Sequence, residues 1–211
     1  FEMERNGVRI DVSVLRDFAD SLRKRMNECE SRVRELAGNP TLNVASPKQL
    51  GELLFEQLKI EPKMKRTNKG SWPTDEETLS ALSDRNPVIE DILDYRGTRK
   101  LLSTYIEPLP GYISERDGRV HTTFNQALTA TGRLSSSNPN LQNIPIRTEE
   151  GQQIRRAFVA PEGCVVMSAD YSQIELRIMA HFCGDVHMLQ AFRDGEDVHK
   201  STAAKIFSTS L

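Results

Sequence analysis

The residues best suited to chemistry lie in the stretch MSADYSQIELRIMAH, Met167 to His181. Asp170 stands where a run of apolar, strand-like residues ends and a helical spacing of apolar residues begins. A carboxylate at such a junction can bind a divalent cation, because magnesium prefers oxygen ligands. The same charge can instead stabilise the N-terminus of the following helix by about 0.3 to 1 kcal/mol. Ser172 and Glu175 have the spacing of a capping box, so helix capping is the competing interpretation of Glu175.

A second candidate is the basic stretch KIEPKMKRTNK, in which five cations are set against Glu61 alone. The five cations are Lys59, Lys63, Lys65, Arg66 and Lys69. Such a stretch can neutralise the phosphates of a nucleic acid, although a solvated surface loop has the same composition. The surrounding elements must decide between the two interpretations.

The chain has 211 residues and a net charge of -2, which suits a globular protein of one large domain or two small ones. No apolar run approaches the roughly 20 residues of a membrane span, and the first residues lack the order of a signal peptide. We therefore expect a cytoplasmic protein without a membrane partner. The cysteines are odd in number and form no CxxC pair, so we expect buried free thiols at Cys29, Cys164 and Cys183.

Two helices are expected in the first 60 residues. Apolar residues follow helical spacing from residue 13 to residue 36, and Gly38 with Pro40 ends this amphipathic helix. A second helix begins at Ser46, the expected N-cap residue. Pro47 takes the first helical position, and Gln49 completes a capping box.

Further helices are expected after the basic stretch. Thr74 and Glu77 repeat the capping-box spacing and begin a third helix, which places the basic stretch at a tip between two helices. Residues 87–110 form another helical stretch, closed by Pro108 and Pro110. The front half of the chain is therefore expected to be helical.

Strands are expected on both sides of this helical half. Residues 1–11 look like a short strand and a turn. The pair Asp117 and Gly118 lies between two strand-like arms, which predicts a β-hairpin. The polar stretch that follows is rich in Thr, Ser, Asn and Gln and has few apolar residues.

The apolar run CVVMSA, residues 164–169, is interpreted as a buried strand that delivers Asp170 to its exposed end. Helical spacing resumes from Ser172. This order of elements predicts an α+β fold, in which a helical front half precedes an antiparallel sheet and more helix. The subdomain boundary is expected near Pro110.

Two stretches, DYSQIELRIMAH and TATGRLSSSNPNLQNIP, resemble hallmark motifs of the family A DNA polymerases, the bacterial DNA polymerase I type. The resemblance runs from FEMERNGVRID to DVHKSTAAKIF and covers nearly the whole chain. It implies a strand leading into the palm at residues 1–12, a helical thumb at 13–110, a partial palm at 111–182 and the start of the fingers at 183–211. It also implies a DNA-directed DNA polymerase, a nucleotidyltransferase of DNA replication and repair.

The resemblance implies roles for the residues around Asp170. Asp170 resembles the catalytic aspartate that bridges two Mg²⁺ ions, and the backbone carbonyl of Tyr171 completes the oxygen ligands. Glu175 resembles the steric gate that excludes a ribose 2′-hydroxyl, and Gln173 resembles a neighbour of the nucleotide pocket. His199 resembles the histidine that contacts the phosphates of the incoming deoxynucleoside triphosphate.

The resemblance also implies contacts with primer–template DNA. The minor groove presents acceptors at every base pair, so polar donors can check pairing geometry without reading sequence. The expected minor-groove donors are Arg133, Asn140 and Gln142. The expected contacts along the duplex are Arg96, Lys100 and Arg147, together with Lys63, Lys65 and Arg66 of the basic tip.

The sequence departs from the family pattern at its end, KIFSTSL. A fingers helix with cations for the triphosphate and a His-Asp-Glu motif with a second catalytic carboxylate would follow, so the remainder of a polymerase chain is an expected partner and this fragment is expected to be inactive alone. A non-catalytic DNA-binding module on the same scaffold is the alternative. A single-subunit RNA polymerase is disfavoured, because Glu175 would obstruct a ribose.

Overall fold

The computed structural model describes residues 1–208, apart from the side chains of residues 201 and 205. The chain divides into two compact units, Phe1–Val165 and a second unit that begins at Val166. Each unit is described by itself. Helices dominate, and the strands pair in small antiparallel sheets, so the predicted α+β class is confirmed.

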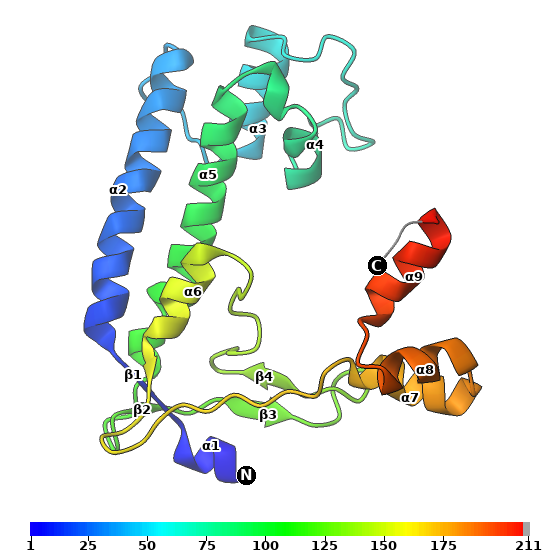
Figure 1. Cartoon of the computed structure of the whole chain (residues 1–211). Helices are drawn as coiled ribbons and strands as arrows, with labels where there is room; N and C mark the ends of the chain where they lie inside the picture. Colours follow the sequence, from blue (N-terminus) through cyan, green and yellow to red (C-terminus); the bar gives the residue numbers. More distant parts are fainter. Residues whose placement is uncertain (209–211) are drawn as a thin grey trace. The chain divides into compact units, whose positions relative to one another are not determined.

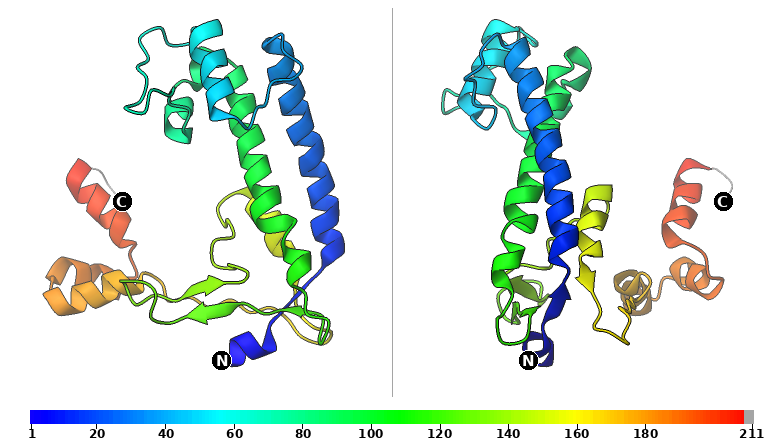
Figure 2. Two further views of the ribbon diagram at one scale, coloured as in Figure 1. Left: turned by 180° about the vertical axis from the view of Figure 1, so that it is seen from behind. Right: turned by 90° about the vertical axis from the view of Figure 1, so that its left-hand side faces the viewer.

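Two long helices, α2 (Val12–Leu36) and α5 (Val88–Leu101), lie side by side in the first unit (Figures 1 and 2). Asp11 caps α2 and accepts hydrogen bonds from the backbone N–H groups of Ser13 and Val14. The helix buries one apolar stripe and ends before Gly38, whose φ of +60° a side chain would disfavour. The predicted amphipathic helix is therefore confirmed.

Charged side chains join α2 to α5 outside the apolar stripe. Arg25 forms a two-point contact with Asp94, at 2.7 Å through Nε and 2.6 Å through Nη2. Arg32 pairs with Asp91 at 2.6 Å. Between these pairs the Cys29 thiol lies buried and donates to Asp94 Oδ2 at 3.3 Å. Burial, helped by the Asp94 carboxylate, raises the pKa of Cys29 to about 11, so the thiol stays protonated at neutral pH.

Four short elements pack at the end of α2 and the start of α5. They are α3 (Pro47–Gly51), the π-helix η1 (Glu52–Gln57), α4 (Glu76–Ser80) and the 3-10 helix η2 (Ser83–Arg85). Their apolar side chains form the first core cluster, centred on Leu50, Leu79 and Ile89. Ser46 caps α3 as predicted. The second half of the predicted capping box is wrong, because Gln49 Oε1 accepts from the backbone N–H of Asn43.

The cap of α4 differs from the prediction by one residue. Asp75 accepts from the N–H and hydroxyl of Thr78, whereas Thr74 is buried and its oxygens accept from Arg96. The neighbouring carboxylate is the stronger acceptor for a helix N-terminus, which explains the shift. Residues 58–75 connect η1 to α4 as a loop, so the predicted basic tip is confirmed as a connection between helices.

The helix α5 continues as η3 (Leu102–Ile106) and then η4 (Leu109–Tyr112), close to the predicted end. A three-stranded sheet follows in the order β2 (Arg119–Val120), β1 (Val8–Ile10) and β5 (Phe158–Val159). Val8 lies opposite Val120, and Ile10 lies opposite Phe158. A second sheet pairs β3 (Thr123–Asn125) with β4 (Ser135–Ser137).

Two strand predictions in this unit need correction. The turn at Gly118 is present: its φ is +68°, and its N–H donates to the Ser114 carbonyl. However, η4 takes up the start of the expected first strand, so only a single β-bridge forms, between Ile113 and Val120. Strand β2 therefore pairs with β1 in place of a hairpin partner. Residues 2–6 form the short helix α1 (Glu2–Asn6), so the expected initial strand is confirmed only at β1.

The second core cluster joins the base of α2, the turns after α5, the three-stranded sheet and α6 (Glu149–Arg156). Its fully buried members include Leu15, Val120 and Ile154. The cluster draws residues from both sides of Pro110, so one apolar core supports the helical and the β-rich parts of this unit. The subdomain boundary near Pro110 stays a prediction.

In the second unit, the residues up to 208 form three helices, α7 (Ile174–Cys183), α8 (Val186–Arg193) and α9 (Val198–Phe207). The predicted strand at residues 164–169 is wrong. Val165 and Met167 are 88% and 84% exposed, and within residues 1–208 no neighbouring strand pairs with this segment. An apolar run without a ladder partner cannot form a strand, whatever its β-propensity.

Two further expectations, the capping box at Ser172 and the buried thiols at Cys164 and Cys183, also fail. Gln173, with φ of +52°, precedes α7, and Ser172 instead offers its backbone carbonyl to Arg177, so the predicted capping box at Ser172 is wrong. Cys164 and Cys183 are exposed, so the expectation of buried thiols holds only for Cys29. In the described part of the chain, no helix is long and apolar enough to cross a membrane.

Candidate nucleic-acid interface and metal-binding carboxylate

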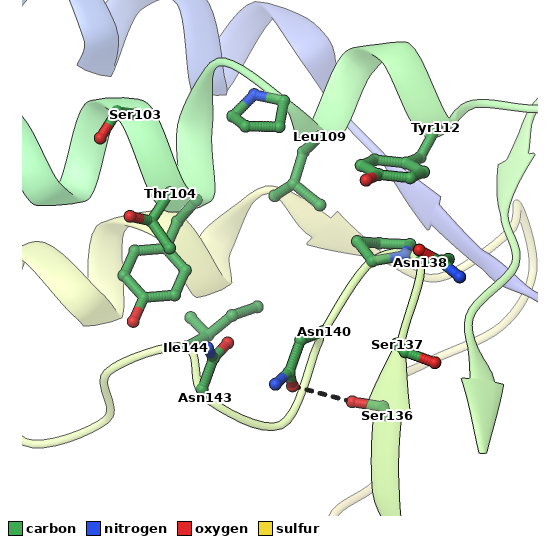
Figure 3. A pocket seen from close by; sticks show the side chains of 13 residues that line it. Ser103, Thr104, Leu109, Tyr112, Ser136, Ser137, Asn138, Asn140, Asn143 and Ile144 are labelled. Carbon is green, nitrogen blue, oxygen red and sulfur yellow. Dashed lines mark hydrogen bonds between the residues drawn. The ribbon is translucent and has the colours of Figure 1, made fainter. Parts of the chain in front are cut away.

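An open groove of about 540 Å³ lies in the first unit (Figure 3). One wall comes from η3 and η4 and the other from the loop after β4. Nine of its lining residues have hydroxyl or amide side chains, and the other four are the apolar residues Pro108, Leu109, Pro139 and Ile144. The nine are Ser103, Thr104, Tyr105, Tyr112, Ser136, Ser137, Asn138, Asn140 and Asn143. These hydroxyl and amide groups can donate and accept hydrogen bonds, and the lining carries no charged side chain.

Two buried hydroxyls hold the loop that brings Asn140 and Gln142 together. Thr122 Oγ1 donates toward the carbonyls of Ser137 (3.1 Å) and Pro139 (2.7 Å). Ser136 Oγ accepts from the backbone N–H groups of Leu141 (3.0 Å) and Gln142 (3.2 Å) and lies 3.0 Å from Asn140 Oδ1. Sequence reasoning missed both hydroxyls, because each bonds to a loop that no local motif connects to it.

The predicted site residues Arg133 and Arg147 lie elsewhere in the same unit. Arg133 is exposed between β3 and β4, and its carbonyl accepts from the Thr129 hydroxyl at 2.6 Å. Arg147 is exposed in the segment before α6, next to the cap residue Thr148. Both side chains are accessible to a ligand.

The predicted contacts on α5 differ from each other. Arg96 is partly buried, and its guanidinium donates to the carbonyl and hydroxyl of Thr74. Burial lowers the pKa of Arg96, and the nearby Asp75 carboxylate opposes this effect. Lys100, one turn further along α5, is exposed. The structure therefore gives Arg96 a role in holding the start of α4, whereas Lys100 is available for an anionic ligand.

The basic tip is organised around one aromatic residue. The Arg66 guanidinium lies 4.6 Å from the Trp72 ring centroid and donates to Glu56 at 2.7 Å. Trp72 Nε1 donates to the same Glu56 oxygen at 2.8 Å. Arg66 is thus engaged within the protein, while Lys63 and Lys65 are exposed.

The second unit holds the carboxylate candidates. Asp170 and Tyr171 are exposed in the extended segment before α7, and Glu175 lies in the first turn of that helix. Gln173 takes the left-handed backbone position directly before α7. Across residues 1–208, no group of three or more His, Cys, Asp or Glu side chains is arranged to hold a metal ion. Asp170 and the Tyr171 carbonyl supply two adjacent oxygen donors.

His199 is exposed in the first turn of α9. The cap residue Asp197 accepts from the N–H groups of His199 (2.8 Å) and Lys200 (3.2 Å). Both backbone hydrogen bonds lower the pKa of Asp197, and the one from Lys200 has the larger effect. The side chains of His199 and Lys200 therefore lie at a helix N-terminus.

Comparison with known proteins decides the family. The sequence model of DNA polymerase family A matches residues 12–211. The chain belongs to the family A DNA polymerases. The thermostable DNA polymerase I of Thermus filiformis is 50% identical over 205 residues, which cover 97% of this family A chain and 24% of that protein. The DNA polymerase I of Chloroflexus aurantiacus is 46% identical over 209 residues, covering 98% of the chain and 22% of the relative.

A solved structure matches this family A chain throughout. The polymerase domain of Pol1 from M. smegmatis, in complex with a DNA primer–template and dNTP, is 41% identical and has a TM-score of 0.86. The match covers 99% of the family A chain and 36% of that domain. The chain spans about a quarter of the length of the curated relatives it matches.

Proposed function

We propose that this chain acts in a DNA-directed DNA polymerase, which transfers nucleotides from deoxynucleoside triphosphates to the 3′ end of a primer. The likeness to a polymerase domain bound to primer–template DNA and dNTP carries the proposal, because it extends over 99% of the chain. The groove with hydroxyl and amide side chains and the exposed cations of the first unit support the proposal, because both can bind a nucleic acid. In this proposal residues 1–12 lead into the palm, 13–110 form the thumb, 111–182 belong to the palm and 183–211 begin the fingers.

The DNA-binding part of the proposal rests on two kinds of side chain. Asn140, Gln142 and Arg133 offer donors to minor-groove acceptors, which every base pair presents. The proposed phosphate contacts are Lys63, Lys65, Lys100 and Arg147, together with Arg66 and Arg96, which also hold the basic tip and the start of α4. Such an interface binds DNA without selecting a sequence.

The catalytic part of the proposal centres on Asp170. Its exposed carboxylate and the adjacent Tyr171 carbonyl are hard oxygen donors, which suit Mg²⁺ bound by one or two carboxylates together with substrate phosphates. Two Mg²⁺ ions at this position would activate the primer hydroxyl and neutralise charge on the phosphates. Glu175 restricts the space beside the sugar, Gln173 borders the nucleotide, and His199 donates to its phosphates.

Equilibrium binding tests this function directly. Labelled primer–template DNA is titrated with the chain by fluorescence anisotropy at two salt concentrations and with two unrelated sequences. We expect an affinity that falls steeply with salt and is the same for both sequences, because the proposed contacts are phosphates and minor-groove acceptors. An affinity that is insensitive to salt, or that strongly favours one sequence, would overturn the proposal.

A further inference from the structure

The donors and acceptors around Ser136 can be assigned without ambiguity. Backbone N–H groups can only donate, so Ser136 Oγ must accept from Leu141 (3.0 Å) and from Gln142 (3.2 Å). A serine hydroxyl accepts at most two hydrogen bonds and has one proton to donate. Both acceptor positions are used, so the proton must go to the remaining neighbour, Asn140 Oδ1, at 3.0 Å.

The same reasoning fixes the side-chain amide of Asn140. The atom that lies 3.1 Å from the Gln142 N–H must be an acceptor, which makes it the carbonyl oxygen. That oxygen also accepts from Ser136 Oγ, so both of its lone pairs are used. Figure 3 shows the Asn140 oxygen turned toward Ser136 and its nitrogen turned away. Among residues 1–208, no hydrogen bond holds the two protons of Nδ2.

The position of Ser136 suits it to this role. Its side chain lies in the wall of the groove and only 5% of the residue is exposed, whereas Asn140 is exposed on the same loop. Removing the hydroxyl would leave the Leu141 N–H without its acceptor and would take away one of the two donors that hold the Asn140 oxygen, leaving only the shared Gln142 N–H. The Asn140 amide would then rotate by 180° more readily. A rotated amide would present an oxygen where a donor is needed.

We propose that Ser136 is a positioning residue that orients the Asn140 amide so that its NH₂ group, and never its oxygen, faces the minor groove of bound DNA. This inference rests on the proposed function, since it concerns how the same interface recognises its ligand. Purine N3 and pyrimidine O2 atoms are acceptors, so an amide oxygen in this position would repel them. The oriented amide therefore recognises a feature that all four base pairs share.

The test removes one acceptor at a time from the DNA. Primer–templates that each carry a single 3-deazapurine, which lacks the N3 acceptor, at successive steps near the primer terminus are titrated with the 211-residue chain. At the step facing Asn140 we expect the affinity of the unmodified protein to fall about fivefold, the effect of one net hydrogen bond. In Asn140→Ala the ratio at that step should be close to one, and in Ser136→Ala it should fall clearly below fivefold, because one of the two donors that hold the Asn140 oxygen is gone.

Thr122→Val is the matched control. Thr122 is 7% exposed and its hydroxyl holds the same loop through Ser137 and Pro139, but it makes neither hydrogen bond to Asn140. A general loosening of the loop would affect both variants alike. The proposal instead requires that Thr122→Val keep the fivefold penalty and that Ser136→Ala reduce it.

A second variant serves if Ser136→Ala does not fold. Asn140→Asp keeps an oxygen for Ser136 and Gln142 and replaces only the outward NH₂ group. It should retain slow hydrogen exchange at the Leu141 and Gln142 amides and lose the 3-deazapurine penalty. Fast exchange at those amides in Asn140→Asp, or an undiminished penalty in Ser136→Ala, would overturn the assignment.

The outcomes separate this inference from the proposed function. If the unmodified chain binds primer–template with the expected salt dependence but shows no 3-deazapurine penalty at any step, the role of Ser136 is wrong while DNA binding stands. If the chain does not bind primer–template at all, the proposed function fails and the inference fails with it.

Discussion

Lys63 and Lys65 of the basic tip are expected to account for a defined part of the salt dependence of DNA binding. Both side chains are exposed, whereas Arg66 is engaged by Glu56 and Trp72 and would change the shape of the loop if removed. The informative change is therefore Lys63→Ala and Lys65→Ala, alone and together.

The magnitude follows from counterion release. Each phosphate contact contributes about 0.9 to the slope of log K against log salt on duplex DNA, so each single substitution should reduce the slope by about 0.9 and the double by about 1.8. Raising the salt from 50 to 200 mM weakens the binding of both proteins, and the fold-loss of affinity should be about twelve times smaller for the double variant than for the unmodified chain. Anisotropy titrations at four salt concentrations measure both slopes.

Lys24→Ala is the matched control, because it removes the same charge from an exposed position in the middle of α2. We expect its slope to equal that of the unmodified chain. Equal slopes for Lys24→Ala and for the single variants Lys63→Ala and Lys65→Ala would refute the reasoning, because net charge and not placement would then govern binding.

Three further predictions concern stability and selectivity. Asp94→Asn should lower the free energy of unfolding in urea by about 1 to 2 kcal/mol, because it breaks the two-point contact between Arg25 and a carboxylate that is 29% exposed. An effect below about 0.5 kcal/mol would mean that the contact contributes no more than an ordinary surface ion pair. The Asp117 carboxylate and the Glu4 carbonyl raise the pKa of His121 above 6.5, so the stabilisation that protonated His121 gives the fold is complete below pH 6.5 and is lost as pH rises through the raised pKa. Asp117→Asn should reduce the pH dependence of the free energy of unfolding, measured in urea across that window. An unchanged pH dependence would contradict this. Glu175→Ala, placed in an active polymerase, should improve ribonucleotide incorporation relative to deoxynucleotides in primer extension, and unchanged discrimination would count against its role beside the sugar.

The helical part of the fold was accessible from sequence because its signals are local. The apolar spacing of α2 and the cap at Ser46 each depend on residues within one or two turns, and both are confirmed. The cap of α4 was misplaced by one residue because Thr74 and Asp75 both fit the pattern, and the contact with Arg96, 22 residues away, decides between them.

The β-rich part was less accessible because pairing is not local. The run at residues 164–169 has strand-like composition, but strand formation depends on a partner that the run itself does not specify. The Ser136 hydroxyl gave no sequence signal for a related reason. Its role depends on a loop closing over it and on the geometry of two backbone N–H groups, and any of the three consecutive serines would look the same in sequence.

The claim that this chain carries the catalytic carboxylate of a DNA polymerase is tested most directly by exchange. The segment of the Thermus aquaticus polymerase that is 49% identical over 206 residues is replaced by this chain, and Mg²⁺-dependent primer extension is measured with and without Asp170→Asn. We expect the chimera to extend the primer and Asp170→Asn to reduce the rate at least about a hundredfold while DNA binding is retained. A chimera that binds primer–template and extends it equally well with Asp170→Asn would contradict the account. A chimera that binds primer–template but extends nothing would contradict it as well, and would favour a non-catalytic DNA-binding role for this scaffold.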